Sequence, residues 1–517
     1  MLLAILSGLL TALSMPTVVW DKLLPNLGSL AWFGLVPLMM AVRGASLKKA
    51  FRLGFAAGFV HYLISLYWMF IALHRYGEVP SPLALLGLGA GVAIEAMFPA
   101  VACWFSVALS RRRVPFWLAF SLVWVSVEWA RHCVPLGGFG WASLAYSQRE
   151  FLTLLQLLDV TGIYGVVFLI VLGNSVLNEI LLWRRGMAPH APAAAIGLFV
   201  VSLLISLVYG YFRLPQIRAA EKSSETLKIS MVQGNIPQDE KYQEEMTVEI
   251  VVRHLVLTSK AEIEDPDLII WPEAAFPGVA GPELTRIEEL QTLKKPLLMG
   301  VVTYEGRIPD VWPAKPEDHF ALHNSALLLE PEGIIADRYD KVHLVPMGEY
   351  VPFANVLFFI KQIVPDMTSF SPGRGWHLLT LTSGTSPVPF GVTICYEDLF
   401  PGISRTFTRQ GARFLVNLTN DGWYDRSSAV FQHFDFSRYR AIENRRAMVR
   451  ATNTGKTAFF SPTGEEIAAA PVFEEATLTA NVPLVGVKSL YTTYGDVFAW
   501  GCVVGLGLIT ARVAFRK

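Results

Sequence analysis

Apolar residues dominate the first 212 positions of this 517-residue chain, and polar residues are much more frequent over positions 218–490. A helix needs about 20 mostly apolar residues to cross the hydrocarbon core of a membrane. The apolar stretches therefore predict eight transmembrane helices, near residues 2–20, 27–43, 52–74, 83–109, 114–132, 159–182, 192–212 and 494–514. The first stretch has no basic start and no clear cleavage site, so we expect a retained helix rather than a signal peptide.

The segment between the seventh and eighth predicted spans shows a different pattern. Residues 247–264 carry apolar side chains at helical spacing, and short strand-like runs occur at 226–233, 267–273, 296–302, 324–331, 389–395 and 413–420. Strands that alternate with helices indicate an α/β sheet. We therefore expect three regions: a membrane domain of seven spans over 1–217, an α/β domain over 218–490 and a C-terminal span over 491–517.

Composition and charge agree with a polytopic membrane protein. The chain is 53% hydrophobic and 17% charged, and positions 1–216 hold only 21 of its Asp, Glu, Lys and Arg residues. Lys and Arg are more frequent in the short flanks on the side of both predicted termini, and cytoplasmic flanks carry this excess. The pattern therefore predicts the 218–490 region outside the cytoplasmic membrane, which in a bacterium is the periplasm. We find no phosphate-binding glycine loop and no basic stripe typical of nucleic-acid binding.

Three polar residues stand at or just after the ends of predicted strands. Glu273 closes the run 267–273, Lys341 follows a strand and turn over 332–341, and Cys395 closes 389–395. In open α/β sheets, reactive groups gather at the carboxyl ends of strands. Cys395 also precedes a predicted helix, whose N-terminal N–H groups favour a thiolate. Taken singly, each residue also fits a structural role. Glu273 could cap a turn, Lys341 could be a solvated surface lysine, and Cys395 could be a small buried hydrophobe.

Acidic residues also occur within or near the predicted spans. Glu95 lies in the middle of one span, and Glu128 and Asp159 lie near the outer ends of two others. A charge in the centre of a bilayer costs about 3 kcal/mol on insertion scales. We therefore expect these carboxylates to face the interior of the bundle. A functional role and a structural ion pair both satisfy that expectation.

The sequence around each of the three strand-end residues resembles a motif of the nitrilase superfamily. WPEAAFP surrounds Glu273, YDKVHLVPMGEYVP surrounds Lys341 and GVTICYED surrounds Cys395. With GGFGWASLAYSQ (137–148), MVQGNIPQDEKY (231–242) and the flanking spans, the whole chain resembles the apolipoprotein N-acyltransferase family. This resemblance implies a polytopic α-helical bundle of about eight spans that carries a nitrilase-like αββα sandwich.

The resemblance also implies a reaction and a set of roles. Glu273 would act as base, Lys341 as oxyanion donor and Cys395 as nucleophile, while Glu349, Tyr396 and Glu397 match the family motif and would shape the site. The family moves a fatty acyl chain from a phospholipid, through a cysteine thioester, to the α-amino group of a diacylglyceryl-modified cysteine. That cysteine is the N-terminus of a lipoprotein precursor. The resemblance implies no metal or soluble cofactor, and we expect a monomer in a bacterial inner membrane.

Four residues are predicted to contact the lipid substrates. Tyr242 stands where the family often has Trp, and Leu357, Phe358 and Phe359 lie in the apolar stretch 351–364. That stretch is too short to span a membrane, so it is either a lid that dips into the outer leaflet or a core helix. Met347, where the family often has Phe, is a second departure that bears on substrate preference.

Two other functions are compatible with the same residues. One is a membrane-tethered amidase or nitrilase in which water is the second nucleophile. The many predicted spans argue against it, because a tether needs only one. The other is a transporter or scaffold whose nitrilase-like domain has lost catalysis. The presence of Glu273, Lys341 and Cys395 argues against that alternative.

Overall fold

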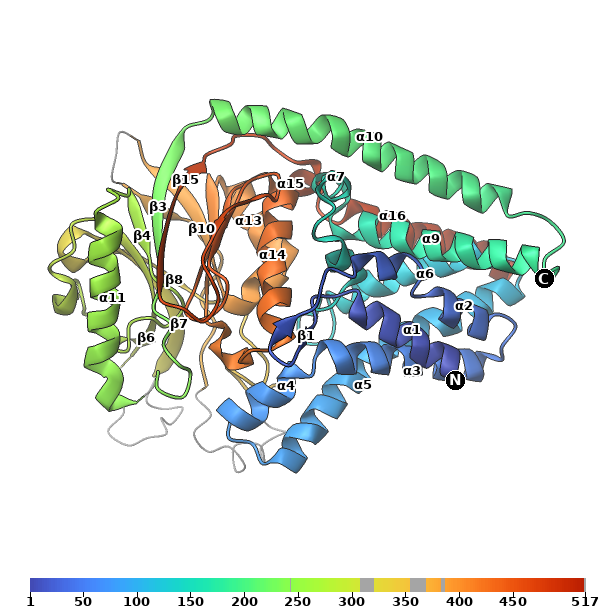
Figure 1. Cartoon of the computed structure of the whole chain (residues 1–517), viewed down its shortest axis with the longest axis horizontal. Coiled ribbons are helices and arrows are strands. Elements are labelled where there is room, and N and C mark those ends of the chain that lie inside the picture. The colour runs from blue at the N-terminus through green and yellow to red at the C-terminus, as the bar shows by residue number, and fades with distance from the viewer. Residues whose placement is uncertain (242, 307–319, 354–368, 383–385, 516–517) are drawn as a thin grey trace.

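The computed structural model describes residues 1–241, 243–306, 320–353, 369–382 and 386–515. A helical bundle built from the N-terminal half and the last helix lies beside a sandwich of two β-sheets (Figure 1). The bundle elements are α1 (Leu2–Leu13), α2 (Val36–Val42), α3 (Leu47–Ser65), α4 (Trp68–Ile71), α5 (Ser81–Arg111), α6 (Phe116–Arg131), α7 (Leu152–Leu155), α8 (Leu158–Thr161), α9 (Ile163–Arg184), α10 (Ala193–Ser223) and α16 (Val497–Phe515).

Small residues bring the helices of the bundle close together. A Cβ added at Gly54 of α3 would lie 2.5 Å from the Pro99 carbonyl of α5, and one at Gly58 would lie 3.0 Å from the Cα of Ala96. Such close approach of two backbones is typical of helices that associate in lipid, where the hydrophobic effect provides little driving force for association. Helix α10 packs differently, because most of its side chains are exposed and it runs along the outside of the bundle to the sandwich (Figure 1).

The prediction of eight spans is met only in part. Within the described residues, α5, α9, α10 and α16 are long and apolar enough to cross a membrane. A fifth span results if α3 and the segment Trp68–Tyr76, bent by 54° from it, count as one. The stretch 2–20 contains a helix of 12 residues, 27–43 contains the short helix α2, and α6 has 16 residues. Pro16 lies shortly after the end of α1 and is incompatible with a continuing helix.

The predicted α/β domain is confirmed. In the described chain, one sheet has the order β15 (Ala476–Pro483), β3 (Thr226–Gln233), β4 (Leu268–Ile270), β6 (Leu297–Glu305), β7 (Ala321–Glu330) and β8 (Ile334–Asp340), with β5 (Val279–Ala280) paired to β6. The other has the order β14 (Glu466–Ala469), β13 (Ala458–Phe460), β12 (Met448–Thr452), β11 (Phe414–Thr419), β10 (Val388–Ile394) and β9 (Leu379–Leu381).

Parallel strands form the centre of each sheet, and helices cover the outer faces. Strands β3, β4 and β6 run parallel in one sheet, and β10, β11 and β12 run parallel in the other. The sheets contact each other between β3 and β12 and between β7 and β10. Helix α11 (Thr247–Glu262) packs on the first sheet, and α13 (Pro401–Gln410) and α14 (Ser428–Asn444) pack on the second. The layers therefore follow the expected αββα order (Figure 1).

Helix α14 lies between the second sheet and the bundle. Polar contacts join it to the loop that follows α6. The Trp141 indole donates to the side chain of Gln432 at 2.6 Å, and the Tyr439 hydroxyl donates to the Ala145 carbonyl at 2.7 Å. Asp159 accepts from Arg445 at 2.8 Å and from Arg213 at 2.9 Å. Asp159 thus has structural ion-pair partners, which link α8 to the end of α14 and to α10.

Candidate active site

Glu273 lies three residues beyond the end of β4, with its carboxylate buried and held by two donors. The Asn324 amide donates to Oε1 at 2.8 Å, and the backbone N–H of Asn420 donates to Oε2 at 2.9 Å. Gly300 on the neighbouring strand β6 leaves room for this turn. A Cβ there would lie 2.5 Å from the Ala274 nitrogen and 2.6 Å from the Glu273 Cα. The carboxylate is therefore fixed from both sheets.

Lys341 directly follows β8, and its buried ammonium lies among carboxylates. Its Nζ is 2.9 Å from Glu349 Oε1 and 3.8 Å from Glu273 Oε1. The Asn324 amide donates to the same Glu349 oxygen at 3.0 Å, so one side chain joins both acids. Burial alone would lower the pKa of Lys341, but the negative charges of Glu349 and Glu273 more than offset it and raise the pKa. Lys341 therefore stays protonated at neutral pH.

Cys395 directly follows β10 and has a backbone conformation that is unusual for a residue with a side chain. Its φ is +51°, in the left-handed region, and such residues are enriched at functional sites. The thiol is buried, and burial together with the charge of Glu273 raises its pKa, against the opposing effect of Lys341. The expected helix does not begin at Tyr396. A five-residue 3₁₀ helix over Cys395–Leu399 intervenes, and α13 begins at Pro401. Burial outweighs the thiolate-favouring effect that we expected of a helix N-terminus.

Glu397 binds backbone N–H groups on two neighbouring turns. Its carboxylate accepts the backbone N–H groups of Val342, His343 and Ile394 at 2.9–3.0 Å and also receives the Tyr339 hydroxyl at 3.1 Å. These contacts bind the turn after Lys341 to the turn that contains Cys395. Glu397 therefore holds two parts of the candidate site in register.

Tyr396 lies against a loop of the membrane domain. Its ring is stacked on Phe139, with centroids 6.4 Å apart, and its hydroxyl is 3.5 Å from the Gly138 carbonyl. Phe139 in turn stacks on Trp141. The GGFGW motif of the sequence analysis thus forms an aromatic wall beside the residue that follows Cys395.

Arg131 fixes this loop from inside the bundle. Its guanidinium donates to the carbonyls of Phe139 at 2.7 Å and Trp141 at 2.9 Å. The same group pairs with Glu128 at 2.8 Å and with Glu95 at 3.1 Å. Glu95 and Glu128 therefore have a structural partner, and their joint effect is to position the loop that touches Tyr396.

Lys241 is a member of the site that the sequence analysis missed. Its ammonium is buried and donates to the backbone carbonyl of Glu273 at 2.9 Å, and burial lowers its pKa to about 8, against the charges of Glu273 and Cys395. The only available signal was its place in MVQGNIPQDEKY, a motif that drew attention to its neighbour instead.

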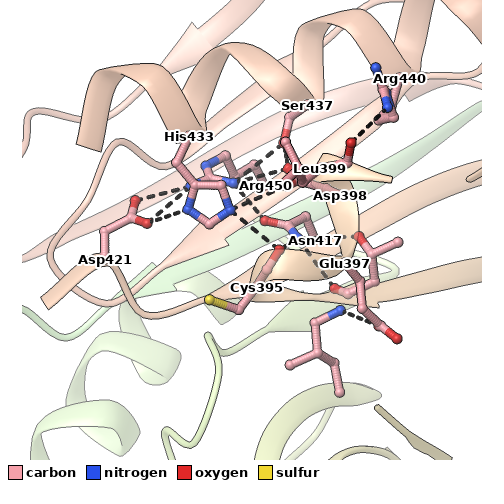
Figure 2. A network of polar contacts seen from close by, with 12 residues as sticks. Cys395, Glu397, Asp398, Leu399, Asn417, Asp421, His433, Ser437, Arg440 and Arg450 are labelled. Carbon is pink, nitrogen blue, oxygen red and sulfur yellow. Dashed lines mark hydrogen bonds and ion pairs between the residues drawn. The ribbon is translucent and has the colours of Figure 1, made fainter. Parts of the chain in front are cut away.

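A buried polar network beneath Cys395 was also missed, and four of its five residues lie within positions 415–457. Figure 2 shows Asp398, Asn417, Asp421, His433 and Arg450 around the carbonyl of Cys395, with the sulfur turned away from them. Arg450 pairs with Asp421 at 3.0 Å and with Asp398 at 3.2 Å. All five side chains are buried.

Four predicted lipid contacts fall outside the described residues. They are Tyr242, Leu357, Phe358 and Phe359. Met347 is described and lies in the turn that precedes Glu349, with φ of +64°.

Known proteins resemble this chain over its whole length. Residues 7–176 match the model of the apolipoprotein N-acyltransferase N-terminal domain, and residues 228–492 match that of carbon-nitrogen hydrolase. The chain is 38% identical to an apolipoprotein N-acyltransferase of Geobacter metallireducens, over 100% of this chain and 95% of that protein. It is 30% identical to one of Chlorobaculum tepidum, over 100% and 96%. A relative from Methylococcus capsulatus is 33% identical, over 90% and 88%.

Proposed function

Because this chain belongs to the apolipoprotein N-acyltransferase family, we propose that it transfers a fatty acyl chain from a membrane phospholipid to the N-terminus of lipoprotein precursors. The acceptor is the α-amino group of an S-diacylglyceryl-cysteine. The observation that carries this proposal is the meeting of a buried carboxylate, a buried ammonium and a buried thiol at strand ends, beside an aromatic loop of the membrane bundle.

In the first half-reaction, the Cys395 sulfur attacks the carbonyl carbon of a phospholipid ester. The thiol proton passes to Glu273 and then to the departing alkoxide, so the products are a Cys395 thioester and a lysophospholipid. A thiolate in the resting enzyme would place a further negative charge near the Glu273 side chain. The raised pKa of Cys395 follows from its burial and from Glu273. We therefore assign proton removal to the same step as attack.

The negative charge of the tetrahedral intermediate needs donors. Lys341 is a buried cation whose raised pKa keeps it protonated and whose charge acts on Cys395, and the Tyr396 N–H follows the nucleophile directly. One such donor typically contributes about 3 kcal/mol to the stability of the transition state. Glu349, 2.9 Å from the Lys341 ammonium, orients it.

In the second half-reaction, the lipoprotein amine attacks the thioester and Cys395 leaves as the thiol. Glu273 receives the proton of the attacking amine and returns one to the sulfur. Cys395 is again a free thiol and Glu273 has given up its proton, so the cycle can repeat. Both substrates are lipids, which is consistent with a site beside the Phe139–Trp141 loop of the bundle.

We assign the sandwich to the periplasmic side of a bacterial inner membrane. The excess of Lys and Arg in the flanks on the opposite side supports this orientation. A reporter that is active only in the cytoplasm, fused near Ser224, should be silent. Activity at that position would contradict the orientation.

One assay separates acyl transfer from the alternatives. The purified protein is incubated with phospholipid vesicles and a synthetic diacylated lipopeptide that has a free N-terminus. Transfer predicts that the peptide gains the mass of one acyl chain at its amine. Free fatty acid without a peptide mass gain would indicate hydrolysis, and no product would indicate a scaffold. Either result would overturn the proposal.

A further inference from the structure

The carbonyl oxygen of Cys395 is held by two side chains that reach it from different elements. The Asn417 amide of β11 donates to it at 3.2 Å, and the His433 Nε2–H of α14 donates to it at 3.3 Å. Nε2 also forms an ion pair with Asp398 Oδ1 at 3.2 Å, and the direction of its N–H meets hydrogen-bond geometry at the carbonyl. Figure 2 shows both donors above the turn and the sulfur on its other side.

Arg450 holds both donors in place. It donates to the Asn417 side-chain oxygen at 2.7 Å, which fixes the amide with its nitrogen toward Cys395. It also pairs with Asp421 at 3.0 Å, and Asp421 lies 2.7 Å from His433 Nδ1. A single buried guanidinium on β12 therefore sets the orientation of the two groups that hold the Cys395 carbonyl.

The contacts of His433 require a proton on both ring nitrogens. Nδ1 faces a carboxylate and Nε2 faces a carbonyl, and neither oxygen can donate. The ring of His433 and the guanidinium of Arg450 each form ion pairs with Asp398 and Asp421. The other groups packed on the ring are aromatic, namely Trp141, Tyr424 and Phe436. Burial and Arg450 lower the pKa of His433, but the two aspartates more than offset this and raise it.

The consequence lies on the opposite side of the same peptide bond. A peptide group is planar, and in the trans form its C=O and N–H point in opposite directions. Fixing the Cys395 carbonyl therefore fixes the direction of the Tyr396 N–H. Hydrogen bonds to the carbonyl also polarise the peptide and strengthen that N–H as a donor.

We propose that His433, Asn417 and Arg450 are positioning residues that orient the Cys395–Tyr396 peptide, so that its N–H stabilises the oxyanion of the acyl-transfer step. This inference rests on the proposed function, because it assigns the N–H to the oxyanion. The hydrogen bonds of the network go to the peptide. The charge of Asp421 also raises the pKa of the Cys395 thiol, but Asp421 stays in place in the variants tested below. Loss of a positioning residue should therefore slow reactions that form an oxyanion more than other reactions of the thiol.

The test compares two reactions of Cys395 in the purified full-length protein. Acylation by 4-nitrophenyl butyrate forms an oxyanion, and alkylation by iodoacetamide does not. Both are followed on the Cys395 peptide by mass spectrometry, because the chain has three other cysteines. The activated ester does not require the physiological donor. Acylation of the wild type by this ester but not by phospholipid would contradict the proposed function and leave the peptide inference testable.

Two substitutions at position 433 form a matched pair. In His433→Gln the amide nitrogen can take the place of Nε2, whereas in His433→Asn it can take only that of Nδ1. We expect His433→Asn to slow acylation on the order of tenfold more than alkylation, with partial recovery of acylation in His433→Gln, which loses the same ring charge. Ser437→Ala is the control, because Ser437 belongs to the same network, donating to Asp398 at 2.7 Å and lying 3.5 Å from Arg450, but does not contact the Cys395 carbonyl. It should leave both rates unchanged.

Asn417→Asp provides a second route if the histidine variants fold poorly. It keeps the size of the side chain and places an acceptor where the donor stood. The added carboxylate disfavours the thiolate and slows both reactions, and loss of the donor should slow acylation further than alkylation. Equal losses in both reactions would place the effect on the thiol and overturn the inference. Unchanged acylation in folded His433→Asn or Asn417→Asp would overturn it as well.

Discussion

The ammonium of Lys341 lies 2.9 Å from a carboxylate oxygen of Glu349, and the same carboxylate accepts the backbone N–H of Val345 at 2.8 Å. A turn that follows the strand of Lys341 thus supplies the acid that holds its side chain. Glu273, the expected base, is farther from the ammonium, at 3.8 Å. This division leaves Glu273 free to exchange a proton while Glu349 keeps Lys341 in position.

The first prediction concerns Glu349. Replacing it with Gln removes the nearest negative charge from Lys341, which should then shift toward Glu273 and suppress its action as a base. We expect acyl-enzyme formation from phospholipid to slow by about tenfold or more, the effect of a charged hydrogen bond of roughly 1.5–3 kcal/mol. Rapid-quench mass spectrometry measures the rate. An unchanged rate in a variant with an unchanged melting temperature would exclude this role.

The second prediction concerns the thiol of Cys395. Its pKa lies above the ordinary value of 9.0, because burial and Glu273 disfavour the thiolate. In the absence of substrate, the alkylation rate of the Cys395 peptide by iodoacetamide should therefore still rise with pH beyond 9.0. A plateau at or below pH 8 would show instead a thiolate stabilised in the resting enzyme.

The third prediction concerns Lys241, whose pKa is lowered by burial from 10.5 to about 8. Between these pH values the unfolded chain holds a proton that the folded protein has lost, so stability rises with pH in this window. Below pH 8 the buried charge costs about 3 kcal/mol. Lys241→Met should therefore be more stable than wild type at pH 7, and the difference should shrink toward pH 10. It should also transfer acyl groups more slowly, because the Glu273 carbonyl loses a donor.

Thermal unfolding in one detergent at pH 7 and pH 10 measures this difference. Lys260→Met is a matched control, because Lys260 is an exposed lysine at the end of α11. Its substitution should change stability little at either pH. A Lys241→Met variant that is less stable than wild type at pH 7 would contradict the assignment of a costly buried charge.

The fourth prediction concerns Arg131, which pairs with Glu95 and Glu128 and holds the loop beside Tyr396. Arg131→Met leaves two carboxylates without a cation and should destabilise the protein by about 3–5 kcal/mol. Adding Glu95→Gln and Glu128→Gln should restore much of the melting temperature. The triple variant should still transfer acyl groups slowly, because the backbone carbonyls of Phe139 and Trp141 have lost the hydrogen bonds that Arg131 donates. Full activity in the triple variant would show that the loop needs no such support.

Local sequence patterns predicted the sheets and the strand ends well. The run 226–233 coincides with β3, and Glu273, Lys341 and Cys395 follow strands as expected. These features depend on periodicity and on neighbours in the chain.

The missed features depend on partners that are distant in sequence. Trp141 and Gln432 are 291 positions apart, and Asn420 and Glu273 are 147 apart. No local pattern indicates that Lys241 points inward or that His433 reaches the Cys395 carbonyl. The membrane spans were predicted from apolar length alone, which does not show where Pro16 and neighbouring turns end a helix. The lipid contacts predicted for Tyr242 and for Leu357, Phe358 and Phe359 remain predictions.

The central claim is a covalent acyl-enzyme on Cys395, and phospholipid alone tests it. A two-step mechanism lets the first half-reaction stop at the thioester, so no lipopeptide is needed. Intact-protein mass spectrometry should show one added acyl chain that neutral hydroxylamine removes. Glu273→Gln should acquire it far more slowly, Lys341→Ala should fail through loss of the oxyanion donor, and Cys395→Ala should show none. The same acyl mass on Cys395→Ala would contradict the account.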